Sequence, residues 1–199
     1  TIDLCGCSPL VRLSENDSVQ IKRVMDAGAH GVIVPMVKNA EDAIRAVESV
    51  YYPTKGNRGV GLARAQGYGS SFQNYKNWLE DNAVVIVQVE HIQAALNLEE
   101  IIQTPGIDGF ILGPYDLSAS MGKPGQFEDK DVQSVMSDVL EKARLLDKPA
   151  GIHIIEPDPN ELTKRIAEGF TFIAYSLDIR MLDMSSRQGV SRFKNLFEN

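Results

Sequence analysis

The chain alternates between two kinds of pattern, and this alternation limits the folds that it can adopt. Short runs rich in β-branched and aromatic residues are separated by stretches with helical periodicity. The strand-like runs are PLVRL (9–13), GVIVPM (31–36), VVIVQVE (84–90), GFILGP (109–114), PAGIHI (149–154) and FTFIAYS (170–176), with a weaker candidate at RGVGLA (58–63). Strands that alternate with helices through short connections form parallel βαβ units, so we predict an α/β fold.

The helical stretches carry recognisable start signals. One helix is expected after Asn39, a suitable N-cap, because apolar residues follow it at helical spacing. A second is expected over residues 132–143 for the same periodicity. A third opens at Asp158-Pro159, where aspartate caps the helix and proline takes its first position.

Seven strand candidates are too many for most doubly wound sheets and one short of a (β/α)8 barrel. The glycine fingerprint of a dinucleotide fold is also incomplete, because GVGLA has no third glycine. We therefore predict a TIM (β/α)8 barrel. It would be a single domain over residues 1–199, N-terminally incomplete because the first β/α unit is missing from this chain.

Composition excludes several classes of function. Hydrophobic residues make up 43% of the 199 positions, enough for a sizeable core. A net charge of -7 without a basic stripe argues against a nucleic-acid partner. No apolar run is long enough to span a bilayer, and TIDLCGCSPL does not resemble a signal peptide. Cys5 and Cys7 suit reduced thiols, so we expect a cytoplasmic protein.

Polar residues at strand ends are the candidates for function, because a barrel builds its active site there. Gln88 and Glu90 share one face of a strand whose other residues are apolar. A buried carboxylate is costly unless it is paired or binds a metal. Glu90 and Asp116 end adjacent strands of the series and would repel each other without a proton or cation between them. Oxygen donors alone favour Mg²⁺ or Mn²⁺ over zinc.

The segment GPYDLSAS (113–120) predicts an anion site beside these carboxylates. Its Gly-Pro ends a strand, and Asp116 lies in the first turn of an expected helix, whose free N–H groups favour a carboxylate or phosphate. Arg12, at the end of its own strand, adds a cation that could stabilise an enolate. Together these features fit a small α-keto acid.

Four segments carry a resemblance to a known family. They are VRLSENDSVQIKRVMDAGAHGVIVPMV (11–37), RGVGLARAQGYG (58–69), VQVEHIQAALNLEEI (87–101) and GIDGFILGPYDLSASMG (106–122). The chain resembles the HpcH/HpaI family of metal-dependent (class II) pyruvate aldolases over essentially its whole length, including aldolases of the 2,4-dihydroxyhept-2-ene-1,7-dioate and 2-dehydro-3-deoxyglucarate type. The resemblance implies that the barrel is of the phosphoenolpyruvate/pyruvate type. It also implies cleavage of a 4-hydroxy-2-oxo acid to pyruvate and an aldehyde.

The resemblance also implies residue roles. Glu90 and Asp116 would be the metal ligands, for Mg²⁺ first and Mn²⁺ or Co²⁺ as alternatives. Arg12 and Gln88 would be catalytic, Arg12 at the keto or enolate oxygen. Substrate contacts are implied for Arg12, Gln88, Gly113, Tyr115 and Asp116, the last three through their backbone. The acidic His-containing motif that the family places after its first strand is absent from this sequence.

The C-terminal segment IRMLDMSSRQGVSRFKNLF (179–197) holds more apolar side chains than a final barrel helix usually needs. They are Met181, Leu182, Met184, Val190, Phe193, Leu196 and Phe197. The resemblance implies a homo-oligomer, a trimer or hexamer, in which the last helix is exchanged between subunits. The alternative is that these residues close the barrel of their own chain.

Three other functions remain open at this point. The same site could decarboxylate oxaloacetate or serve a CoA-ester lyase-like relative, and a non-catalytic barrel could bind a keto acid without turning it over. A Schiff-base aldolase is disfavoured because no strand run contains a lysine. His153 could replace the absent base, or it could simply line the pocket. Asp26 could hold a base in position, or it could be a solvated residue of a helix.

Overall fold

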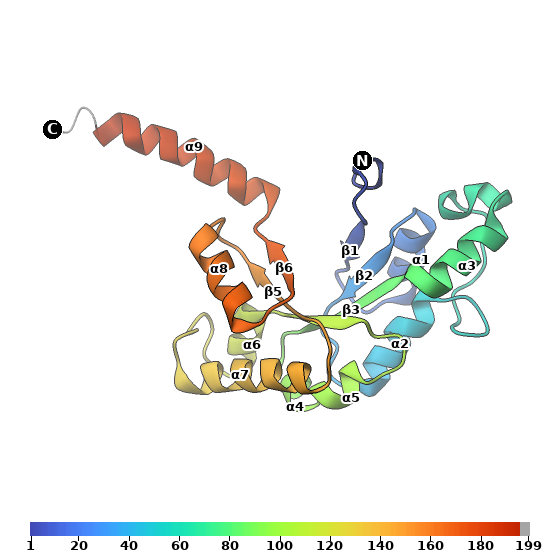
Figure 1. Cartoon of the computed structure of the whole chain (residues 1–199), viewed down its shortest axis with the longest axis horizontal. Helices are drawn as coiled ribbons and strands as arrows, with labels where there is room; N and C mark the ends of the chain where they lie inside the picture. Colours follow the sequence, from blue (N-terminus) through green and yellow to red (C-terminus); the bar gives the residue numbers. More distant parts are fainter. Residues whose placement is uncertain (196–199) are drawn as a thin grey trace.

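A six-stranded parallel sheet organises the molecule, whose computed structural model describes residues 1–195 (Figure 1). Each strand pairs with the next one along the chain, in the order β1-β2-β3-β4-β5-β6. The strands are β1 (Leu10–Arg12), β2 (Gly31–Val34), β3 (Val84–Val89), β4 (Gly109–Leu112), β5 (Ala150–Ile154) and β6 (Phe172–Tyr175). The predicted parallel βαβ arrangement is therefore confirmed.

The sheet curls into a half-barrel with helices along its outer side (Figure 1). Within residues 1–195, β1 pairs only with β2 and β6 only with β5, so the sheet is open. The helices are α1 (Ser18–Asp26), α2 (Ala40–Val50), α3 (Phe72–Asn82), α4 (Ile92–Leu96), α5 (Leu98–Ile102), α6 (Pro114–Ser120), α7 (Lys130–Leu145), α8 (Pro159–Glu168) and α9 (Asp178–Asn195), with 3-10 turns η1 (Asp3–Cys5) and η2 (Arg64–Gly69).

The count of seven strands is wrong, because residues 58–63 form a loop before η2 instead of a strand. Two glycines weaken any extended segment there. The segment is also held by other partners: the Arg58 N–H donates to the Tyr51 carbonyl at 3.0 Å, and the Arg58 side chain is buried over the ring of Tyr52. A closed barrel of eight strands would thus contain two β/α units more than this sheet, instead of one.

The predicted helix starts are confirmed by their capping hydrogen bonds. Asn39 accepts from the Asp42 N–H at 2.9 Å at the start of α2. Asp158 accepts from the Asn160 N–H at 2.9 Å, with Pro159 as the first residue of α8. These caps satisfy N–H groups that a helix leaves without partners at its start.

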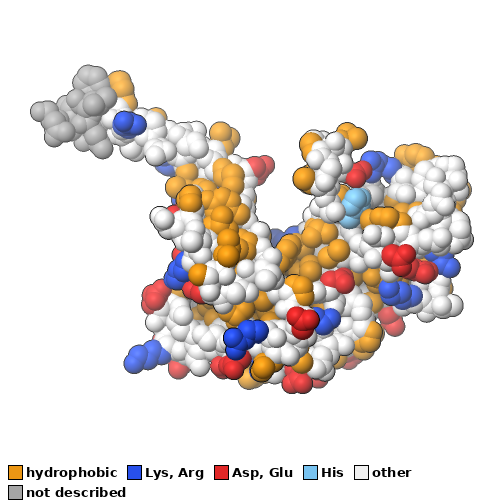
Figure 2. Space-filling view, in the orientation of Figure 1, with side chains coloured by type: hydrophobic (Ala, Val, Ile, Leu, Met, Phe, Trp, Pro, Cys, Tyr) orange, Lys and Arg blue, Asp and Glu red, His pale blue; other side chains and the backbone are white. Residues whose placement is uncertain are grey.

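Strand alternation divides the sheet's side chains between two faces. One set packs with the helices and is fully buried, including Val85, Val87 and Phe110. The register places Arg12 beside Ile33 on the opposite, concave face, and this face also carries Gln88. Figure 2 shows hydrophobic side chains gathered in the hollow that this face lines. Arg12 and Gln88, singled out from the sequence, thus lie on the concave face of the sheet, called the open face below.

Helix α9 projects away from the half-barrel (Figure 1). Its apolar residues are largely exposed, among them Ile179 at 68% and Leu182 at 69%. The high apolar content of this helix therefore does not close the barrel of its own chain in this structure. Leu196 and Phe197, predicted to belong to the same surface, lie outside the described residues. No helix in residues 1–195 combines the length and apolarity needed to cross a membrane.

Candidate metal and substrate site

Glu90 directly follows β3 and is nearly buried, with 6% of its surface exposed. Its Oε1 accepts a hydrogen bond from the backbone N–H of Met36 at 2.8 Å, across the loop that follows β2. Burial raises the pKa of Glu90 above its ordinary value, while the Met36 hydrogen bond lowers it. The carboxylate is therefore held in place but poorly solvated, and a cation beside it would favour its charged form.

Asp116 and Arg12 lie close enough to Glu90 to change its ionisation. The negative charge of Asp116 raises the pKa of Glu90, and the positive charge of Arg12 lowers it. Asp116 comes from the first turn of α6, and Arg12 is the last residue of β1. The fold thus brings together the three charged residues that the sequence placed at strand ends.

Gln88 stands next to this cluster on the concave face. Its Oε1 is buried and has no hydrogen-bond partner among the described residues. Gly113, at the end of β4, packs directly against it: a Cβ at this glycine would lie 3.2 Å from Gln88 Nε2, 3.0 Å from Glu90 Cβ and 3.4 Å from Glu90 Oε2. A glycine at 113 therefore leaves room for both side chains, and Gln88 keeps an oxygen free for a ligand.

The backbone around α6 is only partly free. The Gly113 N–H donates to the Val89 carbonyl at 3.0 Å, and its carbonyl accepts from the Leu117 N–H at 2.9 Å. The Gly113 N–H thus serves strand pairing and is not available for the substrate contact predicted for it. Helix α6 begins at Pro114, which the sequence analysis assigned to the end of the strand. The N–H groups of Tyr115 and Asp116 therefore lie in its first turn.

Two more predicted residues have clear positions. Arg12 is exposed on the concave side, and its Nη1 donates to the Leu13 carbonyl at 3.1 Å. It forms no ion pair with any residue in the described range, so its guanidinium can meet an anionic ligand. The Tyr115 ring packs edge-on against Phe127, with ring centres 4.7 Å apart, beside a cavity of about 320 Å³ that His153 also lines.

The donors present fit a hard divalent ion. Residues 1–195 contain no group of three or more His, Cys, Asp or Glu suited to metal binding, so Glu90 and Asp116 would be the only charged ligands. Mg²⁺ commonly binds through one or two carboxylates and completes its shell with water or substrate oxygens. The buried, unpartnered Gln88 Oε1 could bind one such water.

Two other histidines and the candidate Asp26 have ordinary structural partners. His91 caps α4 by accepting from the Gln93 N–H at 3.1 Å, which is a rim role. His30 lies 3.5 Å from Asp3 at the opposite end of the sheet. Asp26 pairs with Lys22 at 2.5 Å at the end of α1. Asp26 thus has a local structural partner in α1 itself.

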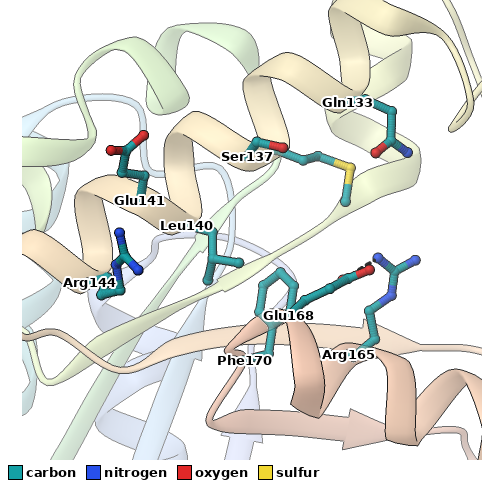
Figure 3. Close-up of a pocket in the computed structure, with 9 residues that line it drawn as sticks. Gln133, Ser137, Leu140, Glu141, Arg144, Arg165, Glu168 and Phe170 are labelled. Carbon is teal, nitrogen blue, oxygen red and sulfur yellow. Dashed lines mark hydrogen bonds and ion pairs between the residues drawn. The ribbon is translucent and has the colours of Figure 1, made fainter.

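A larger cavity, of about 470 Å³, lies in the helix layer between α7 and α8 (Figure 3). Leu140 and Phe170 line it, and Arg165 and Glu168 beside it are ion-paired at 2.8 Å. It contains none of the residues predicted for the site. Its position outside the sheet separates it from the carboxyl ends of the strands.

Comparison with known proteins identifies the family of this chain. The sequence model of the HpcH/HpaI aldolase/citrate lyase family matches residues 1–183. The chain belongs to this family. A solved HpcH/HpaI aldolase/citrate lyase family protein from Burkholderia cenocepacia J2315 is similar at a TM-score of 0.89 and 30% identity, over 97% of this chain and 77% of that one.

Two named aldolases are similar to this chain along most of its length. Pyruvate aldolase of Rhizobium etli is 38% identical over 187 residues, 94% of this chain and 72% of that protein. The 4-hydroxy-2-oxo-heptane-1,7-dioate aldolase of Klebsiella pneumoniae is 39% identical over 188 residues, 93% of this chain and 69% of that protein. The predicted family resemblance is therefore confirmed.

Proposed function

We propose that this HpcH/HpaI family member is a divalent-metal-dependent aldolase that cleaves a 4-hydroxy-2-oxo acid to pyruvate and an aldehyde. The observation that carries the proposal is the convergence of Glu90, Asp116 and Arg12 on the open face of the sheet. The aldolase names of its curated relatives support the same reaction class. The enzyme is thus a carbon–carbon lyase.

Glu90 and Asp116 would hold the metal, with Mg²⁺ as first expectation and Mn²⁺ or Co²⁺ as alternatives. When bound, the ion supplies a Lewis acid that stabilises negative charge on the keto oxygen. Both carboxylates sit at the carboxyl ends of neighbouring strands, where a parallel α/β sheet presents its ligands.

The side chains around the metal ligands have distinct tasks. The Arg12 guanidinium would stabilise the enolate left when the C–C bond breaks, because that charge develops in the transition state. The Gln88 amide would orient the keto acid or a bound water. The N–H groups of Tyr115 and Asp116, in the first turn of α6, would bind the substrate carboxylate.

A base would take the C4 hydroxyl proton, and the C3–C4 bond would break to release the aldehyde and leave the pyruvate enolate. Protonation of C3 would then give pyruvate. Oxaloacetate decarboxylation and CoA-ester lyase-like chemistry would pass through a related enolate, so they are the rival outcomes on the same residues. The test is a panel of 4-hydroxy-2-oxo acids and oxaloacetate, assayed for pyruvate before and after chelation and after addition of Mg²⁺, Mn²⁺ or Co²⁺. Full cleavage after exhaustive chelation would contradict the metal role, and binding without turnover would favour a non-catalytic barrel.

The proposal extends to the assembly. The six strands would be part of a (β/α)8 barrel, and α9 would pack on a neighbouring subunit of a trimer or hexamer. Support comes from the open sheet and from the exposed apolar side chains of the projecting α9 (Figure 1). The free, exposed Cys5 and Cys7 suit the cytoplasmic location predicted from the sequence.

A further inference from the structure

Met36 has an uncommon backbone conformation at the mouth of the half-barrel. Its φ is 55°, in the left-handed region that residues other than glycine and asparagine rarely adopt. It lies between Pro35 and Val37, which are both buried, while 46% of its own surface is exposed. The left-handed turn therefore lets both neighbours stay in the core while the Met36 side chain points outward.

The same turn directs the Met36 N–H at Glu90, whose Oε1 accepts it at 2.8 Å. The loop beyond Met36 is fixed by two further hydrogen bonds. The Lys38 N–H donates to Asp42 at 3.0 Å, and Asn97 donates to the Lys38 carbonyl at 2.9 Å. The donor is thus part of an anchored loop and is held ready for the carboxylate.

The other oxygen of Glu90 points elsewhere. A Cβ at Gly113 would lie 3.4 Å from Glu90 Oε2, so this oxygen faces the end of β4 and the start of α6, which carries Asp116. One oxygen therefore accepts from the Met36 N–H, and the second lies beside Gly113, three residues before Asp116.

We propose that the backbone N–H of Met36 is a positioning group for the metal: it fixes Glu90 Oε1 so that Oε2 and Asp116 meet at one ion. This rests on the metal site proposed above. Groups that orient a metal ligand without touching the metal commonly change its affinity by about 10–100-fold. The backbone at 36 is therefore a determinant of metal affinity, although its side chain is not.

Backbone preference gives the first test. Met36→Gly and Met36→Asn keep the N–H and tolerate a positive φ, so both should bind Mn²⁺ within about twofold of wild type by electron paramagnetic resonance. Met36→Val resists that conformation and should weaken binding about tenfold. Asp147, with φ 52° in the turn after α7, provides the matched control: Asp147→Val meets the same backbone conflict away from the site and should leave Mn²⁺ affinity unchanged.

A backbone ester gives the second test and does not depend on Met36→Val folding. Replacing Met36 by its α-hydroxy analogue removes the N–H and keeps the side chain. The ester at 36 should weaken Mn²⁺ binding about tenfold, measured at a temperature where both proteins are fully folded. The same ester at Met184, in the projecting α9, should leave Mn²⁺ affinity unchanged.

Glu90→Gln distinguishes failure of the proposed metal site from failure of the positioning role of Met36. If wild type binds no Mn²⁺, or if Glu90→Gln keeps its affinity, the metal site and the role of Met36 are both wrong. If Glu90→Gln loses Mn²⁺ but the Met36 ester binds like wild type, the metal site stands and the positioning role is overturned.

Discussion

Replacing Glu90 by glutamine should stabilise the metal-free protein at neutral pH, although it removes a metal ligand. The side chain is almost buried, and its burial is the main reason that its pKa is raised in the folded state. Glutamine has nearly the same shape and offers an amide oxygen to the Met36 N–H in place of Oε1. The substitution thus removes a poorly solvated charge and leaves the local packing in place.

The size of the effect follows from two opposing contributions. Burying one carboxylate costs several kcal/mol in real proteins. The hydrogen bond from Met36 and the nearby Arg12 offset part of that cost, a hydrogen bond to a charged group being worth about 1.5–3 kcal/mol. We expect a net gain on the order of 1 kcal/mol for Glu90→Gln, which corresponds to roughly 2–4 °C in melting temperature for a chain of this size.

The effect has a defined pH dependence. Because the folded pKa of Glu90 lies above its ordinary value of 4.5, this group contributes stability that is fully present below pH 4.5. That contribution is lost as the pH rises through the folded pKa. Wild type and Glu90→Gln should therefore be similarly stable near pH 4, and the variant should become the more stable one towards pH 7.

The assay is urea unfolding with chelator present, from pH 4 to pH 8, for wild type, Glu90→Gln and the exposed control Glu15→Gln. Addition of Mn²⁺ should reverse the order, because an ion at about 100 times its dissociation constant stabilises the protein that binds it by about 2.7 kcal/mol. A Glu90→Gln protein that is less stable than wild type at pH 7 without metal would refute the reasoning, as would a difference that does not change with pH.

Three further predictions concern Gly113, Arg12 and helix α9. Gly113→Ala places a Cβ 3.0 Å from Glu90 Cβ and should lower kcat and metal affinity about tenfold, whereas Gly59→Ala, with open space around it, should change neither. Arg12→Ala should lower kcat more than it raises KM, measured as exchange of the pyruvate methyl protons in D₂O, and Arg12→Lys should recover only part of the lost kcat. Exchange at the wild-type rate in Arg12→Ala would remove Arg12 from catalysis. Light scattering should find an oligomer for the full chain and a smaller species after removal of residues 178–199, and a monomeric full chain would contradict the exchanged helix.

The sequence was most informative where local chemistry decides the structure. The caps Asn39 and Asp158 and the alternation of VVIVQVE were readable because each depends on residues a few positions apart. Glu90 and Asp116 could be placed together for a related reason: parallel strands present their carboxyl ends at one edge. The pattern thus predicted which residues meet at the open face.

Other features depend on distant partners and left no readable pattern. RGVGLA has apolar Val60 and Leu62 in alternation, as in a strand, yet the burial of Arg58 against Tyr52 holds it as a loop. The positive φ of Met36 follows from two buried neighbours, Pro35 and Val37, and methionine itself gives no hint of it. The use of the Gly113 N–H in strand pairing likewise required the register of β3 and β4.

The order of the strands also has a consequence for how the chain assembles. Because each strand pairs with its immediate predecessor, every pair of neighbouring strands is joined by one helical connection, with no other strand in between. The residues of the proposed site all belong to the segment from β1 to α6, and none lies in β5 or β6; they are Arg12, Gln88, Glu90 and Asp116. As the chain leaves the ribosome from its N-terminal side, these residues can come together early, and the later strands then extend a sheet that already carries its chemistry.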